Sequence, residues 1–126
     1  IALVQTGTGE GKAKAAGALH NLACNDDNRV SIAREGGIGP LIALLQTGTG
    51  EGKAMAAAAL WNLAANNDDN KVSIAREGAV GPLIALLKNG SDEGKTNAAA
   101  ALLNLTFNAE SKAKVKEFLS SIEEAY

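Results

Sequence analysis

Alanine and leucine recur with helical periodicity along three long segments of this chain. The clearest segment is EGKAMAAAALWNLAAN, residues 51–66, which contains no proline. Nearly the same sequence occurs at residues 10–24, and a less similar one occurs at residues 93–108. At about 100° per residue, the positions that stay the same between the first two copies form one apolar side of a helix. The predicted long helices are Glu10–Cys24, Glu51–Ala65 and Asp92–Phe107.

Shorter apolar segments between the long ones predict two short helices per unit. A polar NDDN sequence at 25–28 and 67–70 precedes the first short helix, and we expect its Asp side chains to cap that helix. A Gly-Pro pair begins the second, where proline loses no needed hydrogen bond in the first turn. The predicted short helices are Asn28–Glu35, Pro40–Gln46, Asn70–Glu77 and Pro82–Lys88, with the tail of another at 1–5 and one closing helix over Lys112–Tyr126.

The units repeat with a period of 41 and then 42 residues. Aligning 2–24 with 43–65 and 25–42 with 67–84 gives 33 identities in 41 positions, and one extra Asn separates the two registers. A period of this size is typical of a solenoid. We therefore predict an all-α solenoid with three helices per unit, as one array over 1–126. Its parts are a partial first repeat at 1–24, repeats at 25–66 and 67–108, and a C-terminal closing helix at 109–126, and we expect further units before residue 1.

The positions that differ between copies of the long helix fall within roughly a 120° arc. An invariant asparagine lies inside the same arc. A variable face on a rigid repeat is typical of a binding surface. The variable positions are Lys14/Met55/Asn97, Gly17/Ala58/Ala100, His20/Trp61/Leu103 and Cys24/Ala65/Phe107, and the invariant asparagines are Asn21, Asn62 and Asn104.

Composition narrows the classes of partner and compartment. The net charge is −2 and Lys and Arg are scattered, which argues against nucleic acid or an anionic membrane as the main partner. Cys24 is the only cysteine, so an intramolecular disulfide is impossible and a reducing, intracellular location (cytoplasmic or nuclear) is expected. No apolar run approaches the ~18 residues of a membrane span, and no signal peptide is recognised.

Two segments carry a family resemblance: GALHNLACNDDNRVSIAREGGIGPLIALL and AALWNLAANNDDNKVSIAREGAVGPLIALL. Their helix order, Gly-Pro junction and Asn-Leu-Ala sequence resemble armadillo-repeat proteins over essentially the whole chain. The resemblance implies a right-handed superhelix whose third helices line a concave groove. It also implies that Asn21, Asn62 and Asn104 hold the backbone of an extended peptide. The near-identity of the units fits recent duplication or design from a consensus.

The chain departs from the nuclear-import members of that family. Those proteins place Trp four residues before the asparagine and an acidic residue four after it. Here the corresponding residues are Gly17, Ala58 and Ala100, and then Asn25, Asn66 and Asn108. A classical import-receptor role is therefore not expected. His20 and Trp61, directly before the asparagine, are closer to the pattern of catenin-like and plant-type armadillo proteins.

Three motifs suggest other chemistry and have simpler interpretations. KNGSDEGKT, Lys88–Thr96, nearly spells a phosphate-binding loop, but Asn89 replaces its first glycine and a helix is predicted where a strand is needed. Asp26, Asp27, Asp68 and Asp69 lack the downstream Glu and Gly of a calcium loop. His20 and Cys24 lie one turn apart without a visible orienting group or oxyanion pocket.

Two assignments on the variable face keep an alternative. Trp61 is interpreted as a groove contact, and the alternative is a core residue; large changes in volume at its position favour the groove. The asparagines are interpreted as peptide ligands, and the alternative is that each satisfies a neighbouring loop carbonyl.

The sequence thus predicts a non-enzymatic scaffold without cofactor or metal that binds an extended peptide of a partner protein. Alternatively, the chain self-associates through an exposed edge at Ile1, Leu3 and Val4. The predicted peptide-binding residues are Asn21, Asn62, Asn104, His20, Trp61, Leu103, Lys14, Met55, Asn97 and Phe107.

Overall fold

The chain folds into helices only, over the residues that the structure describes. The structure is a computed structural model that describes residues 1, 4–5, 7–106, 112–113, 115–117 and 120. Its helices are α2 (Gly9–Leu22), α3 (Asp26–Arg34), α4 (Ile38–Thr47), α5 (Gly50–Ala64), α6 (Asp68–Arg76), α7 (Val80–Asn89) and α8 (Asp92–Leu105). The predicted all-α class is therefore confirmed.

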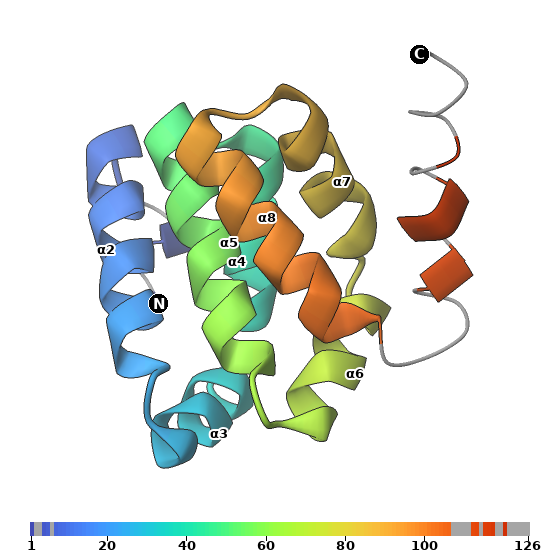
Figure 1. Ribbon diagram of the computed structural model, residues 1–126. Coiled ribbons are helices and arrows are strands. Elements are labelled where there is room, and N and C mark those ends of the chain that lie inside the picture. Colours follow the sequence, from blue (N-terminus) through green and yellow to red (C-terminus); the bar gives the residue numbers. More distant parts are fainter. Residues whose placement is uncertain (2–3, 6, 107–111, 114, 118–119, 121–126) are drawn as a thin grey trace.

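The helices form layers that repeat along the molecule. The long helices α2, α5 and α8 lie side by side in front in Figure 1, with α4 and α7 behind them and α3 and α6 at the end where the long helices finish. Each full unit contains a short, a second short and a long helix: α3, α4 and α5, then α6, α7 and α8. This is the predicted solenoid with three helices per unit.

Small side chains allow the long helices to approach one another closely. Ala56, Ala57 and Ala59 of α5 are fully buried, and the second short helices add larger core side chains such as Leu41 and Leu83. Protein interiors are packed about as densely as organic crystals, so helices that approach closely need side chains that fill the space between them. The stack therefore depends on alanine along α5 and on leucine behind it.

The caps of the first short helices differ from the prediction. Asn25 and Asn67 are the N-caps: their Oδ1 atoms accept hydrogen bonds from the backbone N–H of Asn28 (3.1 Å) and Asn70 (2.9 Å). The aspartates follow inside the first turn, where Asp26 pairs with Arg29. The prediction that the Asp side chains cap was wrong because Asn, one residue earlier, already has the extended backbone of an N-cap. Both helices consequently begin two residues before their predicted starts.

The extra residue of the second repeat is absorbed in the loop after α5. Asn66 has a left-handed backbone, with φ of 52°, and it is the only non-glycine residue with positive φ among those described. Asn28 Nδ2 donates to the Leu22 carbonyl (2.9 Å), and Asn70 Nδ2 makes the equivalent bond to Leu63 (2.9 Å) across a loop one residue longer. The insertion therefore leaves the stacking of the helices unchanged.

Both ends of the predicted array need a separate account. The predicted closing helix lies largely outside the described residues, of which 112–113 and 115–117 are helical and Val115 packs against the core. At the other end the self-association hypothesis required an exposed Val4. Val4 is only 3% exposed and belongs to the core, so this part of the hypothesis was wrong. Ile1 is partly exposed, and Leu3 lies outside the described residues.

Candidate peptide-binding face

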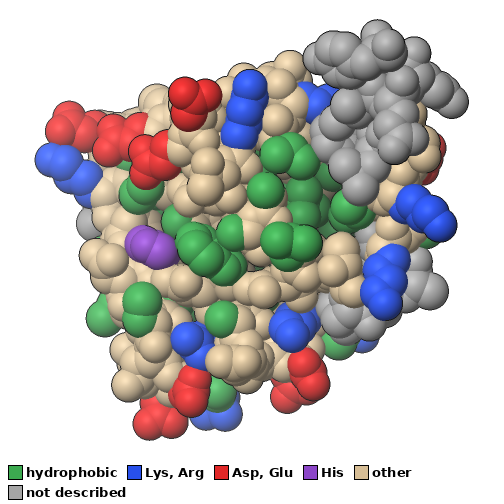
Figure 2. All heavy atoms as spheres, viewed as in Figure 1, with side chains coloured by type: hydrophobic (Ala, Val, Ile, Leu, Met, Phe, Trp, Pro, Cys, Tyr) green, Lys and Arg blue, Asp and Glu red, His purple; other side chains and the backbone are tan. Residues whose placement is uncertain are grey.

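Most variable positions that the structure describes are at least partly exposed on α2, α5 and α8, whereas Ala58 is buried. Figure 2 views the side formed by α2, α5 and α8, where the single histidine, His20, lies beside a group of hydrophobic side chains. We call this surface, made by the outward residues of α2, α5 and α8, the variable face. Its capacity to bind a ligand depends on which hydrogen-bonding groups of its side chains have no partner within the protein.

Asn62 donates to the preceding repeat. Its Nδ2 lies 2.8 Å from the carbonyl oxygen of His20, 2.9 Å from His20 Nδ1 and 3.4 Å from Cys24 Sγ. An amide has two hydrogens to donate and two lone pairs on its oxygen. Among the described residues no hydrogen bond is made to Asn62 Oδ1, and the side chain is partly exposed. The amide is thus held by its nitrogen, while its oxygen stays available.

Asn104 repeats this arrangement one unit later. Its Nδ2 donates to the Trp61 carbonyl at 3.1 Å, the position equivalent to His20. Asn97, a variable position, also donates from Nδ2 to the preceding long helix, at Ala54 O (3.0 Å). Asn21 of α2 is exposed. The side-chain nitrogens of Asn62 and Asn104 therefore do satisfy a neighbouring carbonyl, as the alternative interpretation expected. Both side chains are nevertheless partly exposed.

His20 contacts both the backbone and the amide of α5. Its Nδ1 lies 3.2 Å from Ala58 O and 2.9 Å from Asn62 Nδ2. Because one nitrogen either donates or accepts, it serves Ala58 in one tautomer and Asn62 in the other. Cys24 Sγ points back toward the His20 carbonyl at 3.8 Å and toward Asn62. In the tautomer whose Nδ1 accepts from Asn62, His20 therefore orients the neighbouring amide.

The large apolar side chains of this face are exposed. Trp61 is 37% exposed and Leu103 is 74% exposed, so neither is a core residue, whereas Met55 packs partly against the core. Lys14 forms a 3.0 Å ion pair with Glu10, and both side chains are well exposed. Phe107, the remaining predicted contact, lies outside the described residues.

An acidic end of the same face was missed by the sequence analysis. Glu10, Glu51 and Glu93 lie in the first turns of α2, α5 and α8. Each stands eleven residues before an invariant asparagine, a separation of about 20° around a helix and about 16 Å along it. Figure 2 shows acidic side chains at the edge where these helices begin. The recurrence of glutamate at this position can be read from the sequence. It was overlooked because the predicted arc was defined mainly by positions that differ between copies.

The segment that resembled a phosphate-binding loop is the start of a helix. Ser91 caps α8 by accepting from Gly94 N (3.1 Å), and the Thr96 hydroxyl donates to the Asp92 carbonyl (2.9 Å). A helix, α7, precedes it where such a loop requires a strand. Across the part of the chain that the structure describes, no three His, Cys, Asp or Glu side chains gather to hold a metal ion, and no helix has both the length and the apolarity to cross a bilayer.

Comparison with known proteins agrees with this architecture. The sequence profile of the armadillo/β-catenin-like repeat matches residues 25–65 and 67–107. Among curated protein sequences, none matched.

Solved structures of designed proteins share the fold. A designed armadillo repeat protein is similar with 31% identity and a TM-score of 0.84, over 94% of this chain and 50% of that one. Computationally designed armadillo repeat proteins for modular peptide recognition are similar with 31% identity and a TM-score of 0.83, over 94% and 50%. A third designed armadillo repeat protein, in complex with the peptide (KR)4, shares 28% identity with a TM-score of 0.84, over 97% and 53%.

This chain spans about half the length of those designed proteins. The repeat profile covers well over half of the residues here, in two consecutive copies. The three-helix units and their stacking are those of the structures it resembles. The chain belongs to the armadillo/β-catenin-like repeat family.

Proposed function

We propose that this protein is a non-enzymatic scaffold that binds an extended peptide across the variable face. The observation that carries the proposal is the state of Asn62 and Asn104, whose nitrogens are bound to the preceding helix while their oxygens have no partner among the described residues. A peptide running across α2, α5 and α8 would donate its backbone N–H groups to these oxygens. Such contacts hold a main chain without reading its side chains.

Selectivity in this proposal comes from the side chains that differ between repeats. Trp61 and Leu103 offer exposed apolar surface beside the asparagines, and His20 occupies the equivalent place in the first unit. An aromatic or aliphatic side chain of the peptide would bury area against them. Lys14, Met55 and Asn97 would form the outer margins of the same binding surface. Phe107 lies outside the described residues and stays a predicted contact.

The acidic end of the face favours basic side chains in the peptide. Glu51 is exposed and forms no ion pair among the described residues. A designed relative is seen in complex with (KR)4, which is consistent with this preference. Since the Trp-containing clamp of import receptors is absent, the attraction would come from these exposed carboxylates and would weaken with salt.

The main test compares two variants on a peptide array, with affinities measured by fluorescence anisotropy. Asn62→Ala should weaken every bound peptide by a similar factor, roughly threefold to tenfold for one lost hydrogen bond. Trp61→Ala should change which peptides bind. If neither variant alters any ligand, the variable face is not the binding site.

Two control variants separate binding from folding and from net charge. Asn70→Ala removes a buried amide away from the variable face, so the folded fraction should keep its peptide affinity. Glu51→Gln should weaken the binding of basic peptides, whereas Asp69→Asn, the same change in charge at an exposed residue of α6, should not. Equal effects of the two charge changes would contradict a role for the acidic end.

A second candidate function is self-association, and the exposure of Leu22 favours it. Leu22 is 52% exposed, beside a cavity of about 600 Å³ that is lined in part by Ile1, Leu19 and Ile32. A second copy stacking there would bury this surface. Light scattering should then show a concentration-dependent dimer that Leu22→Ser abolishes; a monomer at all concentrations would refute it.

A further inference from the structure

Two cavities lie at the same place in successive repeats, on the side of the long helices away from the asparagines. The larger, of about 510 Å³, lies between α4, the start of α5, and α7. The smaller, of about 350 Å³, lies between α2 and α4. Lys53 stands nine residues before Asn62, which places the two side chains on opposite sides of α5. These cavities are therefore separate from the variable face.

The two cavities are built from equivalent residues. Lys12, Pro40, Ala43 and Leu44 line the smaller one, and Lys53, Pro82, Ala85 and Leu86 line the larger one, at offsets of 41 and 42 residues. The helix α4 separates them, with Leu44 in one and Leu45 in the other. The cavities are thus neighbours, about one helix diameter apart, or roughly 10 Å.

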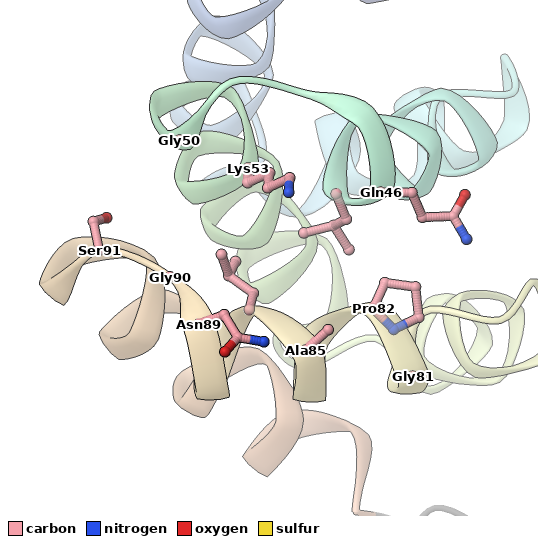
Figure 3. A pocket seen from close by; sticks show the side chains of 11 residues that line it. Gln46, Gly50, Lys53, Gly81, Pro82, Ala85, Asn89, Gly90 and Ser91 are labelled. Atoms are coloured by element: carbon pink, nitrogen blue, oxygen red, sulfur yellow. The ribbon is translucent and has the colours of Figure 1, made fainter.

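A lysine with no carboxylate partner lines each cavity. Figure 3 shows Lys53 pointing from α5 into the space between α4 and α7, with Pro82 and Ala85 facing it. Lys12 and Lys53 are partly buried, and neither forms an ion pair with any described residue. A lysine stem packs against apolar surface while its ammonium group seeks an anion. The chemistry of each cavity therefore suits a carboxylate on a short apolar stem.

We propose that these cavities form a second binding site, for an extended acidic segment of a partner protein. A glutamate side chain enters each cavity, with its methylenes on Pro82 or Pro40 and its carboxylate on Lys53 or Lys12. An extended chain in the polyproline II conformation has three residues per turn and rises about 3.1 Å per residue. Side chains three residues apart therefore lie on the same face about 9 Å apart, which matches the roughly 10 Å between cavities. The partner segment accordingly carries glutamate at every third position.

The larger cavity should bind more strongly. A carboxylate oxygen of Glu77 would lie 3.6 Å from a Cβ added at Gly39, a residue that lines the smaller cavity. This negative charge at its rim opposes an acidic ligand. Lys53 therefore contributes more to affinity than Lys12 does.

The test uses a fluorescein-labelled twelve-residue peptide with glutamate at every third position between Gly and Ser. Fluorescence anisotropy should detect binding, and Lys53→Met, which keeps the apolar stem, should weaken it roughly threefold to tenfold. Lys12→Met should weaken it less. Lys71→Met, the same loss of charge at a residue that lines neither cavity, should have no effect.

Two further ligands distinguish a spaced acidic segment from a general acidic peptide and from a small dicarboxylate. A peptide of the same composition with its glutamates adjacent should bind more weakly, because only one side chain reaches a cavity. No binding, an unchanged affinity in Lys53→Met, or equal binding of the two peptides overturns the proposal. Glutarate binding as tightly as the peptide would also overturn it, in favour of a small-molecule site. Asn62→Ala should leave this binding intact, so the test is independent of the variable face.

Discussion

Asn70 is 4% exposed and donates from Nδ2 to two backbone carbonyls, Leu63 O at 2.9 Å and Arg29 O at 3.1 Å. One bond closes the end of α5 and the other reaches the preceding repeat. Asn62 also donates to the preceding repeat, yet it is partly exposed and its Oδ1 accepts no hydrogen bond from any described residue. Burial therefore separates an asparagine that only stabilises the fold from one that can also bind a ligand.

Asn70→Ala should lower the free energy of unfolding by about 1–3 kcal/mol, because two buried carbonyls lose their donor. Its equivalent, Asn28, is partly exposed and its Nδ2 makes a single bond, to Leu22 O. Asn28→Ala should therefore cost less. Urea unfolding of the two variants tests this, and equal losses would show that burial does not set the difference.

These residue-scale contacts lie beyond what the sequence alone could predict. The periodicity placed Asn62 and Asn104 on the variable arc, but their partners stand 42 and 43 residues earlier in the chain. Such contacts depend on how two helices sit against each other. The same limit applies to Asn70, which was assigned only as the start of a short helix.

Each long helix begins with a hydroxyl cap at an equivalent position. Thr8, Thr49 and Ser91 accept from the backbone N–H of Gly11, Gly52 and Gly94 at 3.0–3.1 Å. Gly50 and Gly52 lie inside the first turn of α5. Glycine there leaves room for the cap, since a Cβ at Gly52 would come within 3.2 Å of Thr49 Oγ1.

Thr49→Ala should cost about 1 kcal/mol through loss of the cap, and Thr49→Ser should restore most of it. Thr47 offers a matched control two residues earlier, because its exposed hydroxyl donates only to Ala43 O of its own helix. Thr47→Ala should change stability little. Thermal unfolding followed by circular dichroism measures all three, and a similar loss in both alanine variants would argue against capping.

The number and kind of helices, by contrast, were predictable from the sequence. Every described helix was expected, with ends that differ by at most two residues. Alanine and leucine patterns define these elements directly because burial repeats with the helical period. The ends shifted because capping depends on one side chain and on the backbone conformation beside it.

At the scale of the whole molecule, stacking of units decides how much each repeat contributes to stability. Leu22 and Leu63 occupy the same position in α2 and α5, but Leu22 is 52% exposed and Leu63 is fully buried. The difference arises because α5 packs between α2 and α8. Identical residues therefore differ in energy according to their neighbours.

Leu63→Ala should lower the free energy of unfolding by about 2–5 kcal/mol, because it leaves a cavity between repeats. Leu22→Ala removes the same atoms from a largely exposed position and should cost well under half as much. Denaturant titration of both variants provides the measurement. Comparable losses would mean that stacking between repeats is not what stabilises the array.

The left-handed turn at Asn66 allows repeats of unequal length to stack in the same way. The helices on either side of this joint keep the same cross-repeat bonds, since Asn104 meets Trp61 just as Asn62 meets His20. The extra residue thus lies in a loop that belongs neither to the variable face nor to the lysine-lined cavities. Modules of 41 and 42 residues are interchangeable building blocks, and an array assembled from either would keep its rows of side chains aligned.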